Sequence, residues 1–293
     1  MLRLYENKII IIVGPTASGK SALAVKIAKK INGEIISADS RQVYKKLNLA
    51  SGKIAKKEMK DVKHYCLDLV SPKTVFTAER FQKCARKAIK TIRKRGKIPI
   101  IAGGTGFYID AALGLVNIPK VPPDWKLRKL LEKKSAEELF KMLKKLNPER
   151  SKTVEPKNKR RLIRAIEIAK FKNSKKTKKS EPASLSPVSD QNNILWLGIK
   201  TEPEELRKKI NKRLNARLKA GMVAEIGRLH RQGVSWKRLG ELGLEPKWIA
   251  MHLRGQISKE EMISKLRNLI WRYSRRQETW FKKNKKIRWI KNK

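Results

Sequence analysis

Cysteine is scarce in this sequence of 293 residues, which contains only Cys66 and Cys84. Two cysteines far apart in the chain, without a partner pattern, exclude a disulfide-stapled scaffold and a zinc site, and they suit a reducing compartment. Long apolar runs are also missing, so no segment is expected to span a bilayer. The first predicted strand follows closely on Met1, with no signal peptide before it. We therefore expect a cytoplasmic protein without a membrane role.

Acidic residues are also few, because 26 Asp and Glu face 73 Lys and Arg, which gives a formal net charge of +47. Solubility requires far less charge, so the excess indicates a polyanionic partner such as a nucleic acid. The alternative is a compositional bias toward lysine, since lysines are spread over every segment. Arginine clusters are therefore more informative, because the planar guanidinium pairs with phosphates through two hydrogen bonds.

The most informative segment is 14–21, which lies between a β-branched run at 9–13 and an apolar-periodic helix. It matches the phosphate-binding pattern G-x-x-x-x-G-K-[ST] in full. Its glycines let backbone N–H groups turn inward, and the helix N-terminus adds a positive dipole end. We predict that a polyphosphate or pyrophosphate is bound by Gly14, Pro15, Thr16, Ala17, Ser18, Gly19, Lys20 and Ser21. Lys20 should reach the phosphates, and Ser21 should face a Mg²⁺ ion.

A second predicted strand at 34–37 leads into Ala-Asp-Ser-Arg-Gln at 38–42. Residues just past the carboxyl ends of parallel strands face the ligand crevice, so Asp39 should lie near the phosphate loop. Two roles are open to this aspartate. It could cap a following helix, which is the commoner use of Asp at such a position, or it could hold a metal ion or accept a proton.

A buried strand at 98–102 leads into a second glycine turn, Gly-Gly-Thr-Gly-Phe-Tyr at 103–108. A nucleotide-hydrolysing protein often ends such a strand in an acidic residue that holds Mg²⁺. Here glycines and Thr105 occupy these positions, and they suit a ligand that approaches the backbone closely. Shorter signals predict a strand at 64–68 and a helix at 77–95, with Gly96 as its stop.

The alternation of strands and helices predicts an α/β fold, namely a P-loop-type core with a mostly parallel sheet, interrupted by an all-helical insertion domain. Three prolines between 119 and 123 mark the boundary, and after it the pattern is purely helical. We predict the first part of the catalytic core at 1–116, the helical insertion at 117–192, ending in a mobile linker at 172–193, and the second part of the core at 193–293. A strand at 194–199 and long basic helices form this last part, with Thr201 and Ser258 as helix caps.

Arginines cluster in two of the predicted helices. Arg160, Arg161 and Arg164 lie in the insertion, where the last two share a face opposite apolar residues. Arg276 and Gln277 lie in the last helix among tryptophans. For the helix of the insertion, the alternative to nucleic acid contact is a solvated charged face. For the last helix, the alternative is that its aromatic residues pack in a core. We favour RNA contact for the insertion.

Five segments together resemble the tRNA dimethylallyltransferase family, the prenyl transferases that modify the adenosine next to the anticodon. They are Gly14-Pro-Thr-Ala-Ser-Gly-Lys-Ser21, Asp39-Ser-Arg-Gln-Val-Tyr44, Gly103-Gly-Thr-Gly-Phe-Tyr108, Arg161 with Arg164-Ala-Ile-Glu167, and Arg276-Gln-Glu-Thr-Trp-Phe281. They follow the family's order and approximate spacing, so the resemblance covers nearly the whole chain. Two positions depart from it. Residues 50–54 read Ala-Ser-Gly-Lys-Ile where the family often has Gly-Thr-Ala-Lys-Pro, and Pro246 stands where a tyrosine is common.

The resemblance implies that the phosphate loop holds dimethylallyl pyrophosphate, that the insertion grips the anticodon stem-loop of tRNA, and that the product is N6-dimethylallyladenosine at position 37. Asp39 would accept the proton of the weakly nucleophilic N6. Thr16, Lys20, Arg213 and Mg²⁺ would stabilise the departing pyrophosphate. Arg213 is matched by its spacing from Thr201, with Arg217 as the weaker candidate. The residues implied to contact tRNA are Asp39, Ser40, Arg41, Gln42, Thr105, Arg160, Arg161, Arg164, Arg276 and Gln277.

Two other functions are compatible with the phosphate loop. A small-molecule or nucleoside kinase would use it for ATP, although the helical insertion and the arginines would then have no role. An RNA-binding protein with a relic loop is the third class, and the intact Lys20, Ser21 and Asp39 argue against it. We expect a monomer that acts on tRNA.

Overall fold

The computed structural model describes Tyr5, residues 7–174 and residues 191–291. Residues 1–116 and 186–293 form one compact unit, the core unit, and residues 117–185 form a second, the helical unit. Most of the linker predicted at 172–193 lies outside the described residues. Its ends belong to helix α8 (Lys159–Ser174) and to a short 3₁₀ turn at Gln191–Asn193. Within the described residues, no helix combines the length and apolarity that crossing a bilayer requires.

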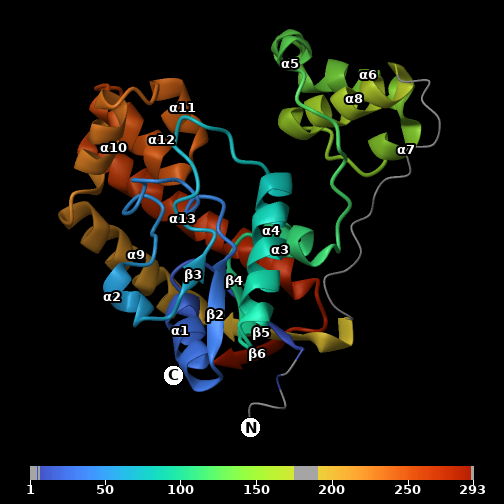
Figure 1. Ribbon diagram of the computed structural model, residues 1–293. Helices are drawn as coiled ribbons and strands as arrows, with labels where there is room; N and C mark the ends of the chain where they lie inside the picture. Colours follow the sequence, from blue (N-terminus) through green and yellow to red (C-terminus); the bar gives the residue numbers. More distant parts are fainter. Residues whose placement is uncertain (1–4, 6, 175–190, 292–293) are drawn as a thin grey trace. The chain divides into compact units, whose positions relative to one another are not determined.

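The core unit is built on a six-stranded sheet with the order β3-β2-β4-β1-β5-β6 (Figure 1). The strands are β1 (Ile9–Val13), β2 (Gly33–Ser37), β3 (His64–Tyr65), β4 (Ile98–Gly103), β5 (Ile194–Lys200) and β6 (Arg288–Lys291). Neighbouring strands of this sheet pair in parallel. The predicted fold class, an α/β core with a parallel sheet, is therefore confirmed. The strand predicted at 64–68 stops after Tyr65, because Cys66 and Asp68 have φ of +62° and +52°, which turn the chain out of the extended conformation.

Helices cover the sheet and extend beyond it. In the core unit they are α1 (Lys20–Lys30), α2 (Lys56–Met59), α3 (Ala78–Lys94), α4 (Gly106–Leu113), α9 (Pro203–Lys219), α10 (Met222–Arg231), α11 (Trp236–Glu241), α12 (Leu244–Leu253) and α13 (Lys259–Lys282). In the helical unit they are α5 (Trp125–Leu131), α6 (Ala136–Leu146), α7 (Pro148–Ser151) and α8. Ser258 caps α13 as predicted by accepting a backbone N–H, and Thr77 and Ser135 cap α3 and α6 in the same way. Thr201 does not, because α9 begins with Glu202 as its N-cap residue and Pro203 in its first turn.

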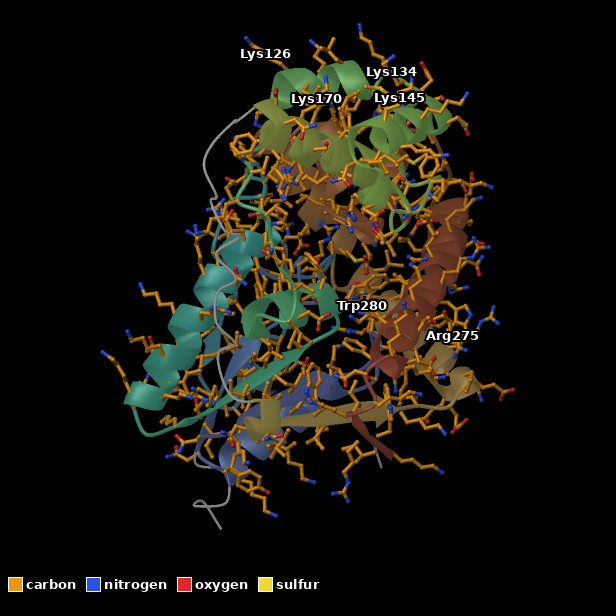
Figure 2. The ribbon with its side chains drawn as sticks, turned by 90° about the vertical axis from the view of Figure 1, so that its right-hand side faces the viewer. Lys126, Lys134, Lys145, Lys170, Arg275 and Trp280 are labelled. Atoms are coloured by element: carbon orange, nitrogen blue, oxygen red, sulfur yellow. The ribbon has the colours of Figure 1, made fainter. Side chains whose placement is uncertain are left out.

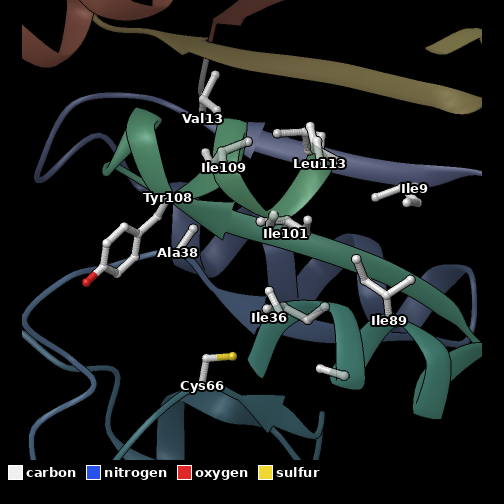
Figure 3. Close-up of a cluster of buried hydrophobic side chains, with 14 of the residues drawn as sticks. Ile9, Val13, Ile36, Ala38, Cys66, Ile89, Ile101, Tyr108, Ile109 and Leu113 are labelled. Carbon is white, nitrogen blue, oxygen red and sulfur yellow. The ribbon is translucent and has the colours of Figure 1, made fainter. Parts of the chain in front are cut away.

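Strand β1 is buried on both faces, which explains its uninterrupted β-branched sequence. Ile9, Ile11 and Val13 pack into one apolar cluster with α3 and α4 (Figure 3). Ile10 and Ile12 point to the opposite face and pack against α1. Side chains alternate along a strand, so a strand covered by helices on both sides needs apolar residues at every position. The phosphate loop thus emerges from the best-buried strand of the sheet.

Helix α13 connects two of the apolar clusters of the core unit. Its first half, with Met262, Leu266 and Ile270, packs into a helical layer that also contains residues of α9, α10 and α12. Near its end, Phe281 packs into the cluster on the sheet. The stretch between them, which carries Gln277, is therefore held close to the carboxyl ends of the strands.

The helical unit has an apolar core of its own. Leucines and isoleucines from α5, α6 and α8 form it, among them Leu131, Leu139, Leu143 and Ile166. One charged side chain, Glu167, is buried beside this core with 2% of its surface exposed. A buried carboxylate requires partners, and these turn out to be arginines that include one the sequence analysis singled out.

Candidate active site

The phosphate loop connects β1 to α1 in a conformation that only particular residues tolerate. Gly19, the N-cap residue of α1, has φ of +88°, and Ala17 has φ of +63°. These left-handed turns bend the backbone around the loop. The side chain of Lys20 folds back so that Nζ donates to the carbonyl oxygen of Pro15 at 3.0 Å. Helix α1 begins at Lys20.

Gln277 of α13 connects the phosphate loop to the end of β4. Its Oε1 accepts from the backbone N–H of Thr16 at 2.8 Å, and its Nε2 donates to the carbonyl oxygen of Gly104 at 2.9 Å. The side chain is buried, with 7% exposed. Both ends of the amide are thus occupied by the protein's own backbone. This gives Gln277 a positioning role in the site, and the tRNA contact predicted for it stays a prediction.

The glycine turn after β4 is needed for this close packing of α13. A Cβ atom on Gly104 would lie 2.1 Å from Nε2 of Gln277, and one on Gly106 would lie 2.1 Å from Nε1 of Trp280. Neither position has room for a side chain. From the sequence we expected these glycines to admit a ligand, but at Gly104 and Gly106 the group that approaches the backbone is α13 itself.

Asp39 lies two residues after the end of β2 and holds a tight turn. Its Oδ1 accepts from the backbone N–H of Arg41 at 2.8 Å. Residues 40–43 form turns, not a helix, so the helix-cap alternative for Asp39 is wrong. No described residue bonds to the second carboxylate oxygen, which leaves it for a substrate.

Asp39 and Arg213 lie close enough to Lys20 to affect its ionisation. The pKa of Lys20 is lowered to about 8, first by burial and then by the positive charge of Arg213, while Asp39 opposes the change. Burial and, secondly, Asp39 raise the pKa of Tyr273 to about 12. Burial also raises the pKa of Tyr108, and Asp39 contributes to this shift. The aspartate therefore shares one region with a lysine, an arginine and two tyrosines.

The two tyrosines were missed by the sequence analysis as site residues. Tyr273 precedes Gln277 by four residues, and side chains at this spacing lie on the same face of a helix. That spacing is the signal that could have found it. Tyr108 was noted only as part of a family motif.

Of the two arginines considered on α9, Arg213 has its charge available. Its Nη2 donates to the carbonyl oxygen of Gly52 at 2.8 Å, and no carboxylate of the described residues forms an ion pair with it. Arg217 instead pairs with Glu245, with 3.1 Å between Nη1 and Oε1, and both side chains are largely buried. A pyrophosphate would find the uncompensated charge on Arg213, so we retain this residue as the candidate.

Two residues predicted to contact tRNA also serve the turn around Asp39. The Oγ1 atom of Thr105 accepts from the backbone N–H of Ser40 at 3.2 Å. Gln42 has both ends of its amide occupied, since Oε1 accepts from Ser37 Oγ at 3.1 Å and Nε2 donates to the carbonyl oxygen of Gly52 at 3.3 Å. The side chains of Ser40 and Arg41 are half-buried beside them.

The arginines of the helical unit divide into exposed and engaged ones. Arg160 and Arg161 are exposed. Arg164 contacts the carboxylate of Glu167 and donates through Nη2 to the carbonyl oxygen of Val121 at 2.9 Å. Glu167 also receives two bonds of 2.8 Å from Arg128. We predicted that Arg161 and Arg164 share an exposed face. This prediction is wrong for Arg164, because its side chain turns inward to the buried carboxylate of Glu167.

Further positive side chains surround the helical unit. Figure 2 shows Lys126, Lys134, Lys145 and Lys170 extending from it toward solvent. On α13, Arg276 is exposed and its guanidinium lies 5.7 Å from the ring centroid of Tyr273. These cations form the surface available to a polyanion in each unit.

A cavity of about 370 Å³ in the core unit contains none of the predicted ligand residues. Trp196, Trp280 and Phe281 contribute to its apolar lining, and Asp110 supplies a carboxyl group. Burial raises the pKa of Asp110 to about 6, although a hydrogen bond with Trp280 opposes the shift. Because no residue of the phosphate loop lines this cavity, we place the candidate site at the loop.

Taken together, the fold and this geometry define a P-loop-type α/β protein whose phosphate loop faces an aspartate and an arginine without an ion-pair partner among the described residues.

Comparison with known proteins points to one family. A sequence model of the IPP transferase family matches residues 42–284. The tRNA dimethylallyltransferase 2 of Treponema denticola is 41% identical over 290 residues, which are 97% of this chain and 96% of that protein. The tRNA dimethylallyltransferase 1 of Geotalea uraniireducens is 38% identical over 286 residues, covering 96% of this chain and 92% of that protein.

A solved structure agrees with these relatives. The crystal structure of the full-length tRNA isopentenylpyrophosphate transferase from Bacillus halodurans aligns with a TM-score of 0.72 and 31% identity, covering 97% of this chain and 90% of that one. The chain belongs to the IPP transferase family. The resemblance inferred from the five sequence segments is thereby confirmed, and the kinase alternative is not favoured.

Proposed function

We propose that the chain transfers the dimethylallyl group of dimethylallyl pyrophosphate to N6 of the adenosine that follows the tRNA anticodon, at position 37, and releases pyrophosphate. The observation that carries this proposal is the convergence of Lys20, Asp39 and Arg213 at the phosphate loop. Two cations suit a pyrophosphate, and the carboxylate beside them suits a group that loses a proton. The family to which the chain belongs supports the same reaction.

The phosphate loop and its neighbours hold the donor. Backbone N–H groups at the start of α1 and the Nζ atom of Lys20 bind pyrophosphate oxygens. The backbone N–H of Thr16 is occupied by Gln277, so Thr16 contributes its hydroxyl group. Arg213 faces the leaving group, where negative charge accumulates as the carbon–oxygen bond breaks.

Asp39 acts on the acceptor. The N6 lone pair of adenine is delocalised into the ring, which makes N6 a weak nucleophile. In the transfer, N6 bonds to the allylic carbon, the electron pair of the broken bond leaves with pyrophosphate, and one N6 proton passes to Asp39. The Arg41 N–H fixes the carboxylate through Oδ1, so its other oxygen is positioned to accept that proton.

A Mg²⁺ ion fits the donor atoms of this site. Among the described residues, no three His, Cys, Asp or Glu side chains gather into a metal-binding cluster. Mg²⁺ commonly uses one or two protein oxygens together with substrate phosphates, and the Ser21 hydroxyl is an oxygen donor of this kind. When bound, the ion would neutralise charge on the pyrophosphate.

We assign tRNA binding to exposed cations of both units. Arg160 and Arg161 of the helical unit are available for the phosphates of the anticodon stem, and Arg276 of the core unit is available near Tyr273. Such contacts fix position without reading sequence. We propose that the enzyme acts as a monomer in the cytoplasm, and light scattering of the purified protein tests the first point.

One experiment tests the proposal. The protein is incubated with labelled dimethylallyl pyrophosphate, Mg²⁺ and an anticodon stem-loop, and the RNA nucleosides are analysed by mass spectrometry. The expected product is N6-dimethylallyladenosine at one position. A stem-loop with guanosine at that position is the matched control. Phosphate transfer from ATP to a small molecule, without prenylation of RNA, would contradict the proposal.

A further inference from the structure

Loop 48–53 of the core unit holds Arg213 and Arg217 of α9 through its backbone. The carbonyl oxygen of Gly52 accepts from Arg213 Nη2 at 2.8 Å, and that of Leu49 accepts from Arg217 Nη1 at 3.0 Å. The loop is therefore the structure that directs the Arg213 guanidinium. A shift of the loop would carry the arginine with it.

One buried carboxylate anchors this loop. Oε2 of Glu225, on α10, accepts from the backbone N–H groups of Asn48 at 3.0 Å and Leu49 at 2.8 Å. Its Oε1 accepts from the backbone N–H of Ala50 at 2.9 Å. Glu225 is 5% exposed. Three consecutive N–H groups bound to one buried carboxylate make a charge-assisted cluster, and a neutral side chain could not satisfy all three.

Gly52 completes the arrangement because it lets the guanidinium lie against the backbone. Its φ is +59°, and a Cβ atom at this position would lie 2.7 Å from Arg213 Nη2. A side chain here would be strained and would also displace the arginine. The loop thus has one segment fixed by Glu225 and a glycine shaped to receive Arg213.

We propose that Glu225 is a positioning residue for prenyl transfer, which holds loop 48–53 so that Gly52 aims Arg213 at the leaving pyrophosphate. The inference rests on the proposed function. A misplacement of about 1 Å at a reacting centre can cost about a hundredfold in rate. Loss of the anchor should therefore slow the step in which pyrophosphate leaves, with little effect on tRNA affinity.

The test compares Glu225→Gln with Glu204→Gln, which makes the same change of charge at the exposed start of α9. The Glu225→Gln change would place an amide donor against backbone donors. We expect a loss of about 10- to 100-fold in single-turnover transfer and weaker binding of inorganic pyrophosphate, with Glu204→Gln unchanged. Gly52→Ala, which displaces Arg213 without altering the buried carboxylate, should give the same losses if Glu225→Gln does not fold.

A double-mutant cycle with Arg213→Gln separates positioning from general stability. If Glu225 acts through Arg213, the double variant is no slower than Arg213→Gln alone. The inference would be overturned if the rate losses of the two single variants multiply in the double variant. It would also be overturned if Glu225→Gln transfers the prenyl group as fast as Glu204→Gln. A parent protein that prenylates no RNA would instead refute the proposed function, and pyrophosphate affinity in the same variants would still test the role of Glu225.

A separate observation concerns the two cysteines, which the sequence analysis left without a partner. Their Sγ atoms lie 2.7 Å apart, with Cys66 just after β3 and Cys84 on α3. Cys66 is buried in the cluster on the sheet (Figure 3), and Cys84 is half-buried. The hydrogen bond from Cys66 and the nearby Lys87 lower the pKa of Cys84, against the effect of burial. The pKa of Cys66 is raised by the same bond and by burial.

We infer that this pair is a modification site at which hydrogen peroxide forms a disulfide. The Cys84 thiolate attacks the peroxide, which breaks the oxygen–oxygen bond, releases hydroxide and leaves a sulfenic acid on Cys84. The Cys66 sulfur then displaces water from that sulfenic acid and forms the Sγ–Sγ bond. The two thiols together lose two electrons and two protons, and one peroxide is reduced to two water molecules.

Peptide mapping of the peroxide-treated full chain tests this inference. We expect a peptide pair joined through Cys66 and Cys84, two hydrogens lighter than the free thiols, that dithiothreitol separates. In Cys66→Ser, Cys84 should proceed to the sulfinic acid, and in Cys84→Ser, Cys66 should stay reduced. Sulfinic acid on Cys84 of the parent protein beside a free Cys66 thiol, or two unreacted thiols, would overturn it.

Discussion

At the scale of single residues, the structure gives Asp39 two separable tasks, one for each carboxylate oxygen. Oδ1 holds the turn by accepting from the Arg41 N–H, and the other oxygen is left for the region shared with Lys20 and Arg213. An asparagine at position 39 can still accept from the Arg41 N–H, but it cannot act as the proton acceptor. Replacement by asparagine therefore isolates the chemical role.

We expect Asp39→Asn to lower single-turnover prenyl transfer by about a hundred- to ten-thousand-fold, the usual contribution of a general base. Donor and tRNA affinity should stay within a few-fold. The melting temperature should not change, because the amide oxygen of the new side chain can still accept from the Arg41 N–H. Rate, affinity and melting temperature are measured on one preparation. A normal rate would contradict the role of base, and a fall only in Mg²⁺-dependent donor binding would indicate a metal ligand.

Lys20 gives a prediction about pH. Its pKa of about 8 in the free protein should rise when a pyrophosphate binds, because a nearby negative charge favours the ammonium form. Below pH 8 the lysine is already protonated and donor affinity should be flat. Above pH 8 binding must take up a proton, so affinity should fall by up to about tenfold per pH unit.

Titration calorimetry in buffers of different ionisation enthalpy measures this proton uptake. Lys20→Arg is the control, since an arginine stays charged over this range and its binding should not depend on pH between about 8 and 10. Donor affinity that is constant across this range in the parent protein would show that Lys20 does not pair with the donor.

At the scale of elements, the contact between α13 and the end of β4 organises the phosphate loop. Gly104→Ala would place a methyl group 2.1 Å from Gln277 Nε2, so α13 or the turn must move. Overpacking of this kind costs about 1–3 kcal/mol. We expect a melting temperature lower by several degrees and weaker donor binding, because Thr16 loses its partner. Gly240→Ala, where an added Cβ meets nothing within 4 Å, should leave both measurements unchanged.

The helical unit offers a second test at this scale. Arg161→Ala should weaken tRNA binding and lower the salt slope of log affinity by about one, as expected for one lost phosphate contact. Its melting temperature should not change, because the side chain is exposed. Arg164→Ala should lower the melting temperature as well, since Glu167, 2% exposed, loses one of its arginines. Equal binding of parent and Arg161→Ala over a salt series would show that this face is only solvated.

At the scale of the whole molecule, net charge and donor choice distinguish this chain from a nucleotide-using protein. A charge of +47 suits a long polyanion, and the β4 end offers glycines where a nucleotide-hydrolysing protein often has an acidic metal ligand. We expect dimethylallyl pyrophosphate to bind more tightly than ATP in the presence of Mg²⁺. Calorimetry with both ligands decides this, and tighter ATP binding would favour a kinase.

Local signals in the sequence were sufficient for the fold class, the phosphate-loop motif and the starts of α3 and α13. A strand that reads as five β-branched residues must be covered on both faces, and a loop of fixed glycine spacing can adopt few conformations. Asp39 was placed near the loop by the same logic, since parallel strands end at one edge. These features depend on residues close together in the chain.

Contacts between distant residues were decided only by the tertiary structure. Gln277 bonds to Thr16 from 261 residues away, and Glu225 reaches Asn48 across 177 residues, so no local pattern could pair them. The choice between Arg213 and Arg217 depended on the position of Glu245, and the contact between the two cysteines on how α3 packs beside β3. Sequence thus determined which groups this protein can use, and packing decided which of them remain free for a substrate, because a charge already paired inside the protein is no longer available to a ligand.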